Sequence, residues 1–213
     1  MAEKFVEDET KRKQERDLEK YRKKAIELGA TDAKKISANM VIIDERVVAK
    51  CIYPKCPGYG TNANCPPYAM KIDEVRKLLD NFHNCIFIRM EIPAEIITGK
   101  AAYQRRSLIK YRIKLTEITS IIESSAFYDG YHLAIGFGNG SCKQILCPKD
   151  ECKVLMTGQS CTHRLRARSP MEAVGMDVYR MATRVGWDIY PIGINTLPTD
   201  IPFGSLFGIV LVN

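Results

Sequence analysis

Residues 136–161 read GFGNGSCKQILCPKDECKVLMTGQSC, a glycine loop followed by four of the eight cysteines in this 213-residue chain. The four thiols are spaced Cys-x4-Cys-x4-Cys-x8-Cys, at Cys142, Cys147, Cys152 and Cys161. An earlier stretch repeats the last two intervals, at Cys51, Cys56 and Cys65. Several thiols gather in loop-like sequence when they bind one inorganic centre. Both groups are therefore predicted to be ligand sets.

The sequence between and around these groups alternates between helical and strand patterns. Helices are predicted over 1–28 (within an N-terminal segment 1–30), 72–82, 100–127 and 169–185. Strands are predicted over 40–43, 47–48, 85–92, 131–137, 187–191 and 206–212. This alternation predicts one α/β or α+β domain, residues 1–213, with a central mixed sheet flanked by helices. The cysteine loops, 51–68 and 142–168, are expected at strand ends, where ligand sites gather in such folds.

Composition points to a globular protein of the cytoplasm. The chain is 46% hydrophobic and 27% charged, and its densely charged N-terminus has no signal-peptide core. Disulfides are rare in the cytoplasm, where clustered cysteines more often bind metal. No apolar run reaches membrane-spanning length, so no membrane partner is expected. The net charge of +7 falls to about +4 if both groups hold anionic clusters. Nucleic acid is therefore not an expected partner.

Iron–sulfur and zinc are the two metals that the cysteine pattern allows. Structural zinc sites favour Cys-x2-4-Cys knuckles in separated pairs, whereas this chain has no Cys-x2-Cys. Cubane clusters favour proline directly after a ligand, and proline follows Cys56, Cys65 and Cys147. Glycine amides in 136–140 could also donate hydrogen bonds to cluster sulfurs. The pattern favours one or two [4Fe-4S] clusters, with zinc as the alternative.

These motifs resemble a known family. The quoted run is Cys51-x4-Cys56-Pro-x-Tyr-Gly-x-Asn-x2-Cys65-Pro-Pro, then Cys142 to Cys161, then Arg168-Ser-Pro-Met-Glu-Ala-Val-Gly-Met-Asp177. It is similar to uncharacterised predicted metal-binding proteins found mostly in methanogenic archaea and anaerobic bacteria. The family commonly has Arg-Pro-Ser-Met-Glu-Ala where this chain has Arg168-Ser-Pro-Met-Glu-Ala. The resemblance implies metal binding in the cytoplasm of an anaerobe, and it implies no reaction.

The two groups differ in the number of thiols. The second has four, a full set for a cubane that transfers electrons, whereas the first has three and leaves one iron without a protein thiolate. Another residue, or a thiol of the second group, could complete it, or both groups could share one centre. Two functions stay open: a module that carries electrons, clusters or sulfur to a partner redox enzyme or accessory complex, and an enzyme that uses the open iron.

Three other features of the sequence carry structural or functional predictions. Cys85, in the apolar run 85–88, is predicted to be a small buried hydrophobe. Glu172 is predicted to close a capping box with Ser169 at the start of the helix 169–185. The alternating Arg164, Arg166 and Arg168, next to His163, are interpreted either as an anion or nucleotide contact near a cluster or as charge compensation for it together with ordinary solvated side chains.

Overall fold

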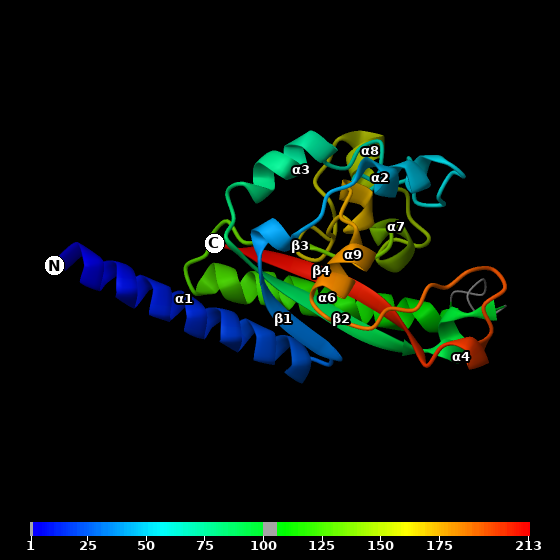
Figure 1. Ribbon diagram of the computed structural model, residues 1–213. Coiled ribbons are helices and arrows are strands. Elements are labelled where there is room, and N and C mark those ends of the chain that lie inside the picture. Colours follow the sequence, from blue (N-terminus) through cyan, green and yellow to red (C-terminus); the bar gives the residue numbers. More distant parts are fainter. Residues whose placement is uncertain (1, 100–105) are drawn as a thin grey trace.

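The computed structural model describes residues 2–99 and 106–213, so the predicted helix start at 100–105 lies outside the described residues. A four-stranded sheet lies at the centre (Figure 1), with the order β1-β2-β4-β3. Its strands are β1 (Asp32–Ser37), β2 (Asn84–Pro93), β3 (Ile135–Phe137) and β4 (Phe203–Val212). The predicted layered fold class is confirmed. Every pairing between these strands is antiparallel, where a mixed sheet was expected.

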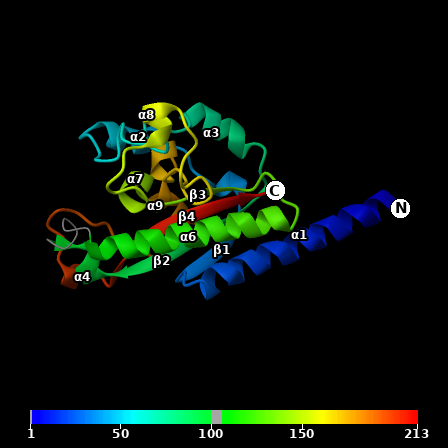
Figure 2. The ribbon, with the colours of Figure 1, turned by 180° about the vertical axis from the view of Figure 1, so that it is seen from behind.

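Side chains of β2 and β4 alternate between the two faces of the sheet. Both faces are buried, each beneath its own layer of packed segments. On one face, Ile86, Ile88 and Val210 pack against the helices α1 (Ala2–Glu27) and α6 (Arg106–Tyr128). Figure 2 shows these two helices along the same side of the sheet. On the other face, Phe87 and Ile209 pack under the segments that carry the cysteines. The sheet thus separates a helical layer from a cysteine-bearing layer.

The cysteine-bearing layer is built from short elements (Figure 1). They are α2 (Glu45–Ile52), α3 (Ile72–Leu79), α7 (Cys142–Ile145), α8 (Lys153–Thr157), η2 (Glu172–Val174) and α9 (Val178–Arg184). Three further short elements are η1 (Ala38–Met40), α4 (Ala94–Ile97) and η3 (Pro198–Asp200). The predicted helix at 72–82 and the predicted strands at 85–92 and 206–212 are confirmed, as is the described part of the helix predicted over 1–28. Of the helix predicted over 100–127, the described part is confirmed.

The strands predicted at 40–43 and 47–48 are wrong. Residues 38–40 form η1, and Ile43 makes only an isolated bridge to Met176. Residues 47–48 lie inside α2, because the Asp44 side chain accepts a hydrogen bond from the Arg46 amide and starts a helix there. The strand β1 at 32–37 was not predicted.

The helix predicted over 169–185 is two short helices. Gly175, at φ 88°, ends η2 in a left-handed conformation, and Asp177 then caps α9 through the Arg180 amide. The capping box with Ser169 does not form, because Met171 precedes η2 and makes no side-chain cap. The strand predicted at 187–191 is also absent: Trp187 instead packs on Phe87 and donates to Asp32. The strand predicted at 131–137 shortens to β3.

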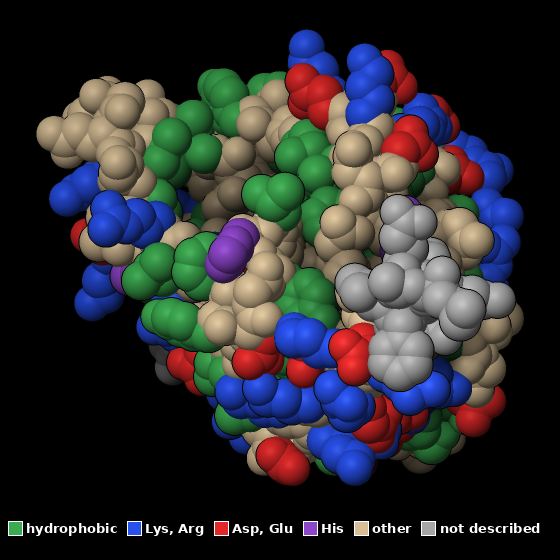
Figure 3. Space-filling model, turned by 90° about the vertical axis from the view of Figure 1, so that its left-hand side faces the viewer, with side chains coloured by type: hydrophobic (Ala, Val, Ile, Leu, Met, Phe, Trp, Pro, Cys, Tyr) green, Lys and Arg blue, Asp and Glu red, His purple; other side chains and the backbone are tan. Residues whose placement is uncertain are grey.

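Charged and hydrophobic side chains occupy different parts of one face of the molecule. On the face shown in Figure 3, basic and acidic side chains are interleaved along the lower part and hydrophobic side chains gather above them. Among the helices of the described residues, none is both long enough and apolar enough to cross a membrane.

Candidate metal centres

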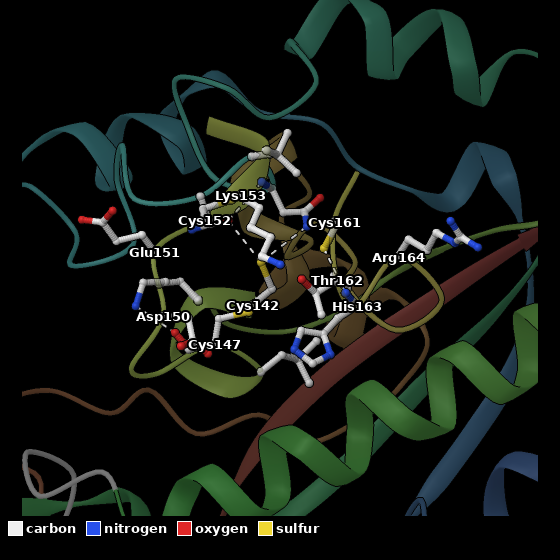
Figure 4. Close-up of a pocket in the computed structure, with 17 residues that line it drawn as sticks. Cys142, Cys147, Asp150, Glu151, Cys152, Lys153, Cys161, Thr162, His163 and Arg164 are labelled. Atoms are coloured by element: carbon white, nitrogen blue, oxygen red, sulfur yellow. Dashed lines mark hydrogen bonds between the residues drawn. The ribbon is translucent and has the colours of Figure 1, made fainter. Parts of the chain in front are cut away.

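The second cysteine group surrounds one cavity. Its volume is about 510 Å³, and all four thiols line it, at Cys142, Cys147, Cys152 and Cys161. Figure 4 shows the cysteines around this space, with Lys153 extending over it and Glu151 directed outward. His163 and Arg164 also line the cavity, and the His163 amide donates to the Cys161 sulfur at 3.4 Å. The structure therefore brings the predicted four-thiol set together around one space.

Short helical turns position these thiols. Cys142 is the first residue of α7, and Cys152 immediately precedes α8, which Gly158 ends at φ 67°. The loop between them is closed by Lys143, whose ammonium donates to the Cys147 carbonyl at 2.8 Å. Cys142 and Cys152 are thus each held at the start of a short helix, on either side of the loop that carries Cys147.

Cys142 and Cys147 are partly desolvated and lie close enough to neighbouring cysteines to be repelled by them as thiolates. Burial, opposed by a hydrogen bond from Asn64 and reinforced by neighbouring cysteines, raises the pKa of Cys142 to about 11. Burial, then Cys161, also raises the pKa of Cys147. Metal binding needs thiolates, so uptake at neutral pH must release protons from this group.

The first cysteine group lines a second cavity, of about 390 Å³. Cys51 lies in the last turn of α2, while Cys56 and Cys65 lie in the loop that follows. Cys65 is buried, Cys51 is half-buried and Cys56 is exposed. Burial, followed by repulsion from Cys56, Cys65 and Glu172, raises the pKa of Cys51 to about 11. The predicted three-thiol set also borders one space.

The two cysteine loops are joined by hydrogen bonds between their amide and hydroxyl side chains. Asn62, in the first loop, donates to Ser141 at 3.0 Å and accepts from the Cys142 thiol at 3.3 Å. Asn64 donates to the Cys142 sulfur at 3.4 Å. A β-carbon at Gly58 would lie 3.2 Å from the Cys65 sulfur and 3.1 Å from Ser141 Cβ, so a larger residue there would push the two loops apart by a few tenths of an ångström. The two cavities are neighbours that share a polar wall.

The number of thiols and the size of the cavities bear on which metal centres could fit. Four thiolates on one zinc, at Zn–S distances of about 2.3 Å, lie within about 4 Å of one another. Within residues 2–99 and 106–213, no three Cys, His, Asp or Glu side chains converge closely enough to hold one ion. All eight cysteines are free thiols, and seven of them line cavities that extend beyond a single-ion site. Four thiols are the ligand number of a structural zinc site as well as of a cubane.

Glu172 lies among the first cysteines, which sequence reasoning missed by assigning it to a helix cap. It lines the 390 Å³ cavity with all three thiols, and it lines an adjoining cavity of about 570 Å³ with Cys51 and Cys56. Burial raises the pKa of its carboxyl, which its own backbone amide and Arg112 oppose. The position of Glu172 within the motif from Arg168 to Asp177 could have indicated a site role. The sequence also fits a capping box with Ser169, and that explanation was preferred.

The arginines of the second loop do not act together. Arg168 makes a bidentate ion pair with Glu123 of α6 at 2.6 Å, and Arg166 pairs with Glu117 at 2.8 Å. Both anchor the loop on the helical layer, so neither is an anion contact in the cavity. Arg164 is the member of the triplet that lines it.

Two glycine amides of the loop 136–140 have partners other than sulfur. The Gly136 amide donates to the Glu123 carboxylate at 2.7 Å, and the Gly138 amide donates to the Ser169 carbonyl at 2.9 Å. For these two amides, the expected hydrogen bonds to cluster sulfurs are wrong. The glycine loop instead holds Ser141 and Cys142 against the first loop.

An α+β domain with two neighbouring cysteine-lined cavities is typical of a metal-binding protein. Comparison with protein families agrees: residues 34–212 match the family described as predicted metal-binding protein, DUF2284, and the chain belongs to it. No curated protein and no solved structure matches the chain.

Proposed function

We propose that this metal-binding protein carries iron–sulfur clusters of the [4Fe-4S] type in its two cysteine-lined cavities. We further propose that it passes electrons, or cluster components, to a protein partner in the cytoplasm of an anaerobe. The observation that carries the proposal is the grouping of seven free thiols around two neighbouring cavities. Bound there, a cluster would supply one-electron chemistry.

The residues around the thiols support this role. Cys142, Cys147, Cys152 and Cys161 provide a full cubane ligand set in the second cavity. Asn64 donates a hydrogen bond to one of these sulfurs, and such bonds adjust reduction potential. Lys153, His163 and Arg164 place basic side chains around the same space, where they would offset the negative charge of a cluster.

The test is metal analysis of protein purified without exposure to oxygen. We expect brown protein with iron and acid-labile sulfide in excess of zinc. Stoichiometric zinc without labile sulfide, in cells kept anoxic throughout, would overturn the iron–sulfur proposal in favour of a structural zinc module.

A second candidate is an enzyme that uses the first cysteine group, for sulfur transfer or reductive chemistry. It is favoured by two buried polar atoms of the first cavity, Asn139 Oδ1 and Ser205 Oγ, that have no hydrogen-bond partner in the described part of the chain. Such atoms are suited to hydrogen-bonding a small molecule. The discriminating measurement is electron paramagnetic resonance (EPR) spectroscopy with added small ligands. A change confined to the first centre favours the enzyme, and no change favours the carrier.

A further inference from the structure

The first cysteine group is one donor short of four, and the structure places a carboxylate in the same cavity. Glu172 lines the 390 Å³ cavity together with Cys51, Cys56 and Cys65. It also lines the adjoining cavity on the other side of Cys51 and Cys56. The Glu172 side chain therefore lies where the two cavities meet, beside the thiols.

The backbone around Glu172 is fixed in place from both directions. On its N-terminal side, the Met171 amide donates to the Gly138 carbonyl at 3.0 Å. On its C-terminal side, the Asp44 amide donates to the Gly175 carbonyl at 2.9 Å. Asp44 caps α2, the helix whose last turn carries Cys51, and η2 packs directly on α2. Glu172 and Cys51 thus belong to one rigid frame, as the ligands of a preformed site must.

Glu172 is half-buried, and its carboxylate has few compensating partners. In residues 2–99 and 106–213, Glu172 has no ion pair and no hydrogen bond to another side chain; its backbone amide and the field of Arg112 are its favourable interactions. Removing a carboxylate from water is costly unless a cation compensates it. An iron that the three neighbouring thiols leave with an open coordination position would accept a lone pair from that carboxylate.

We propose that Glu172 is the fourth protein donor of the first metal centre, its carboxylate ligating the metal site that Cys51, Cys56 and Cys65 leave incomplete. The inference rests on the proposed function only to the extent that this group binds metal. It assigns a ligand set of three thiolates and one carboxylate to the first centre and four thiolates to the second. Carboxylate oxygen is a harder donor than sulfur, so the two centres differ chemically.

The test replaces Glu172 by glutamine and by cysteine in the full-length, anaerobically purified protein. Glu172→Gln keeps the shape of the side chain and removes the anionic donor, whereas Glu172→Cys supplies a fourth thiol. Asp150→Asn is the matched control, because Asp150 lines the four-thiol cavity near Cys147. The probe is ¹³C-cyanide, detected by its hyperfine coupling to each reduced cluster in electron–nuclear double resonance (ENDOR) spectra.

We expect no cyanide coupling in the wild type, a new coupling at the first centre in Glu172→Gln, and none in Glu172→Cys or Asp150→Asn. Chelators should remove iron from the first centre of Glu172→Gln about tenfold faster than from the wild type. The unchanged signal of the second centre reports that each variant is folded. Equal cyanide binding in wild type and Glu172→Gln, or binding in neither, would overturn the proposal.

The same variants separate this inference from the proposed function. If the protein holds zinc and no iron, the iron–sulfur proposal fails, and zinc X-ray absorption of the Cys147→Ala variant then tests Glu172. An oxygen donor at about 2.0–2.2 Å beside sulfurs at about 2.3 Å supports the ligand, and its persistence in the Cys147→Ala/Glu172→Gln variant refutes it. If iron is bound and Glu172→Gln changes nothing, the ligand assignment alone is wrong.

Discussion

The two cysteine groups share the spacing x4 and x8 and yet lie in different surroundings. The first cavity is walled largely by apolar side chains, including Ile97, Ile189 and Phe207. The second is bordered by charged ones, including Lys143, Lys153 and Arg164. A repeated spacing can therefore specify ligands without specifying their environment. Reduction potential and lability depend on the environment, so the two centres should differ in both.

Replacing Cys147 by alanine should have the largest effect on metal content. It removes one of four thiolates and should abolish the second centre, lowering bound iron by about half if both cavities hold like clusters. The loop between α7 and α8 should also lose order, because metal binding and local folding are coupled. Iron and sulfide analysis measures the first effect and amide hydrogen exchange the second. Retention of full iron would show that the groups share one centre.

The next largest difference is expected in the rate of metal loss. Cys56 is exposed, and the first group has only three thiols, so chelators should remove metal from the first centre before the second. The single-centre variants Cys147→Ala and Cys56→Ala report each centre separately. Faster loss from Cys56→Ala, which retains the second centre, would reverse the order.

The spacing of apolar residues was enough to predict those helices and strands that bury a regular apolar stripe. The helix α6 and the strands β2 and β4 follow from periodicity alone. β1 was missed because Lys34 and Lys35 interrupt its apolar pattern. In α2, the Asp44 cap prevailed over the strand preference of Val47 and Val48. Gly175 broke a predicted helix because its carbonyl and φ serve a tertiary contact with Asp44.

The candidate site was predictable to the extent that it is made of cysteines. Spacing alone grouped the seven thiols that line the two cavities and separated Cys85 from them. It could not find Asn62 or Asn64, because their contacts to Cys142 join loops about eighty residues apart. Glu172 was missed for a related reason: its environment is created by α2 and the glycine loop, neither of which is its neighbour in sequence.

A smaller effect should follow loss of the hydrogen bond between Asn64 and the Cys142 sulfur. Asn64→Ala should lower the reduction potential of the second centre and leave that of the first unchanged. A hydrogen bond to a ligand sulfur favours the more negative, reduced state, so its removal disfavours reduction. Asn81→Ala is the control, since Asn81 bonds to the Lys77 carbonyl at the end of α3. Redox titration followed by EPR measures both centres, and equal shifts in the two variants would contradict the assignment.

The smallest effect on metal is expected at Cys85, the one cysteine outside both cavities. Cys85 is fully buried in the core between β2 and the cysteine-bearing layer. Cys85→Ala should leave metal content unchanged and reduce the free energy of unfolding by about 1 kcal/mol, through the void left by the sulfur. Loss of iron from this variant would show that Cys85 takes part in a centre.

Alkaline pH should shrink the stability difference between wild type and Cys85→Ala, and by pH 10 it should remove or reverse it. Burial raises the pKa of Cys85 from 9.0 to about 12, so between these values the folded state keeps a proton that the unfolded state has lost. The contribution of the protonated Cys85 thiol to wild-type stability is therefore complete below pH 9. It falls by about 1.4 kcal/mol per pH unit between pH 9 and about pH 12. The alanine variant has no thiol and no such contribution. All other titrating groups are common to both proteins and cancel in the difference. Denaturant unfolding at pH 7.5 and pH 10, without oxygen, measures it; a difference that stays constant or grows at pH 10 would mean that the thiol is not buried as described.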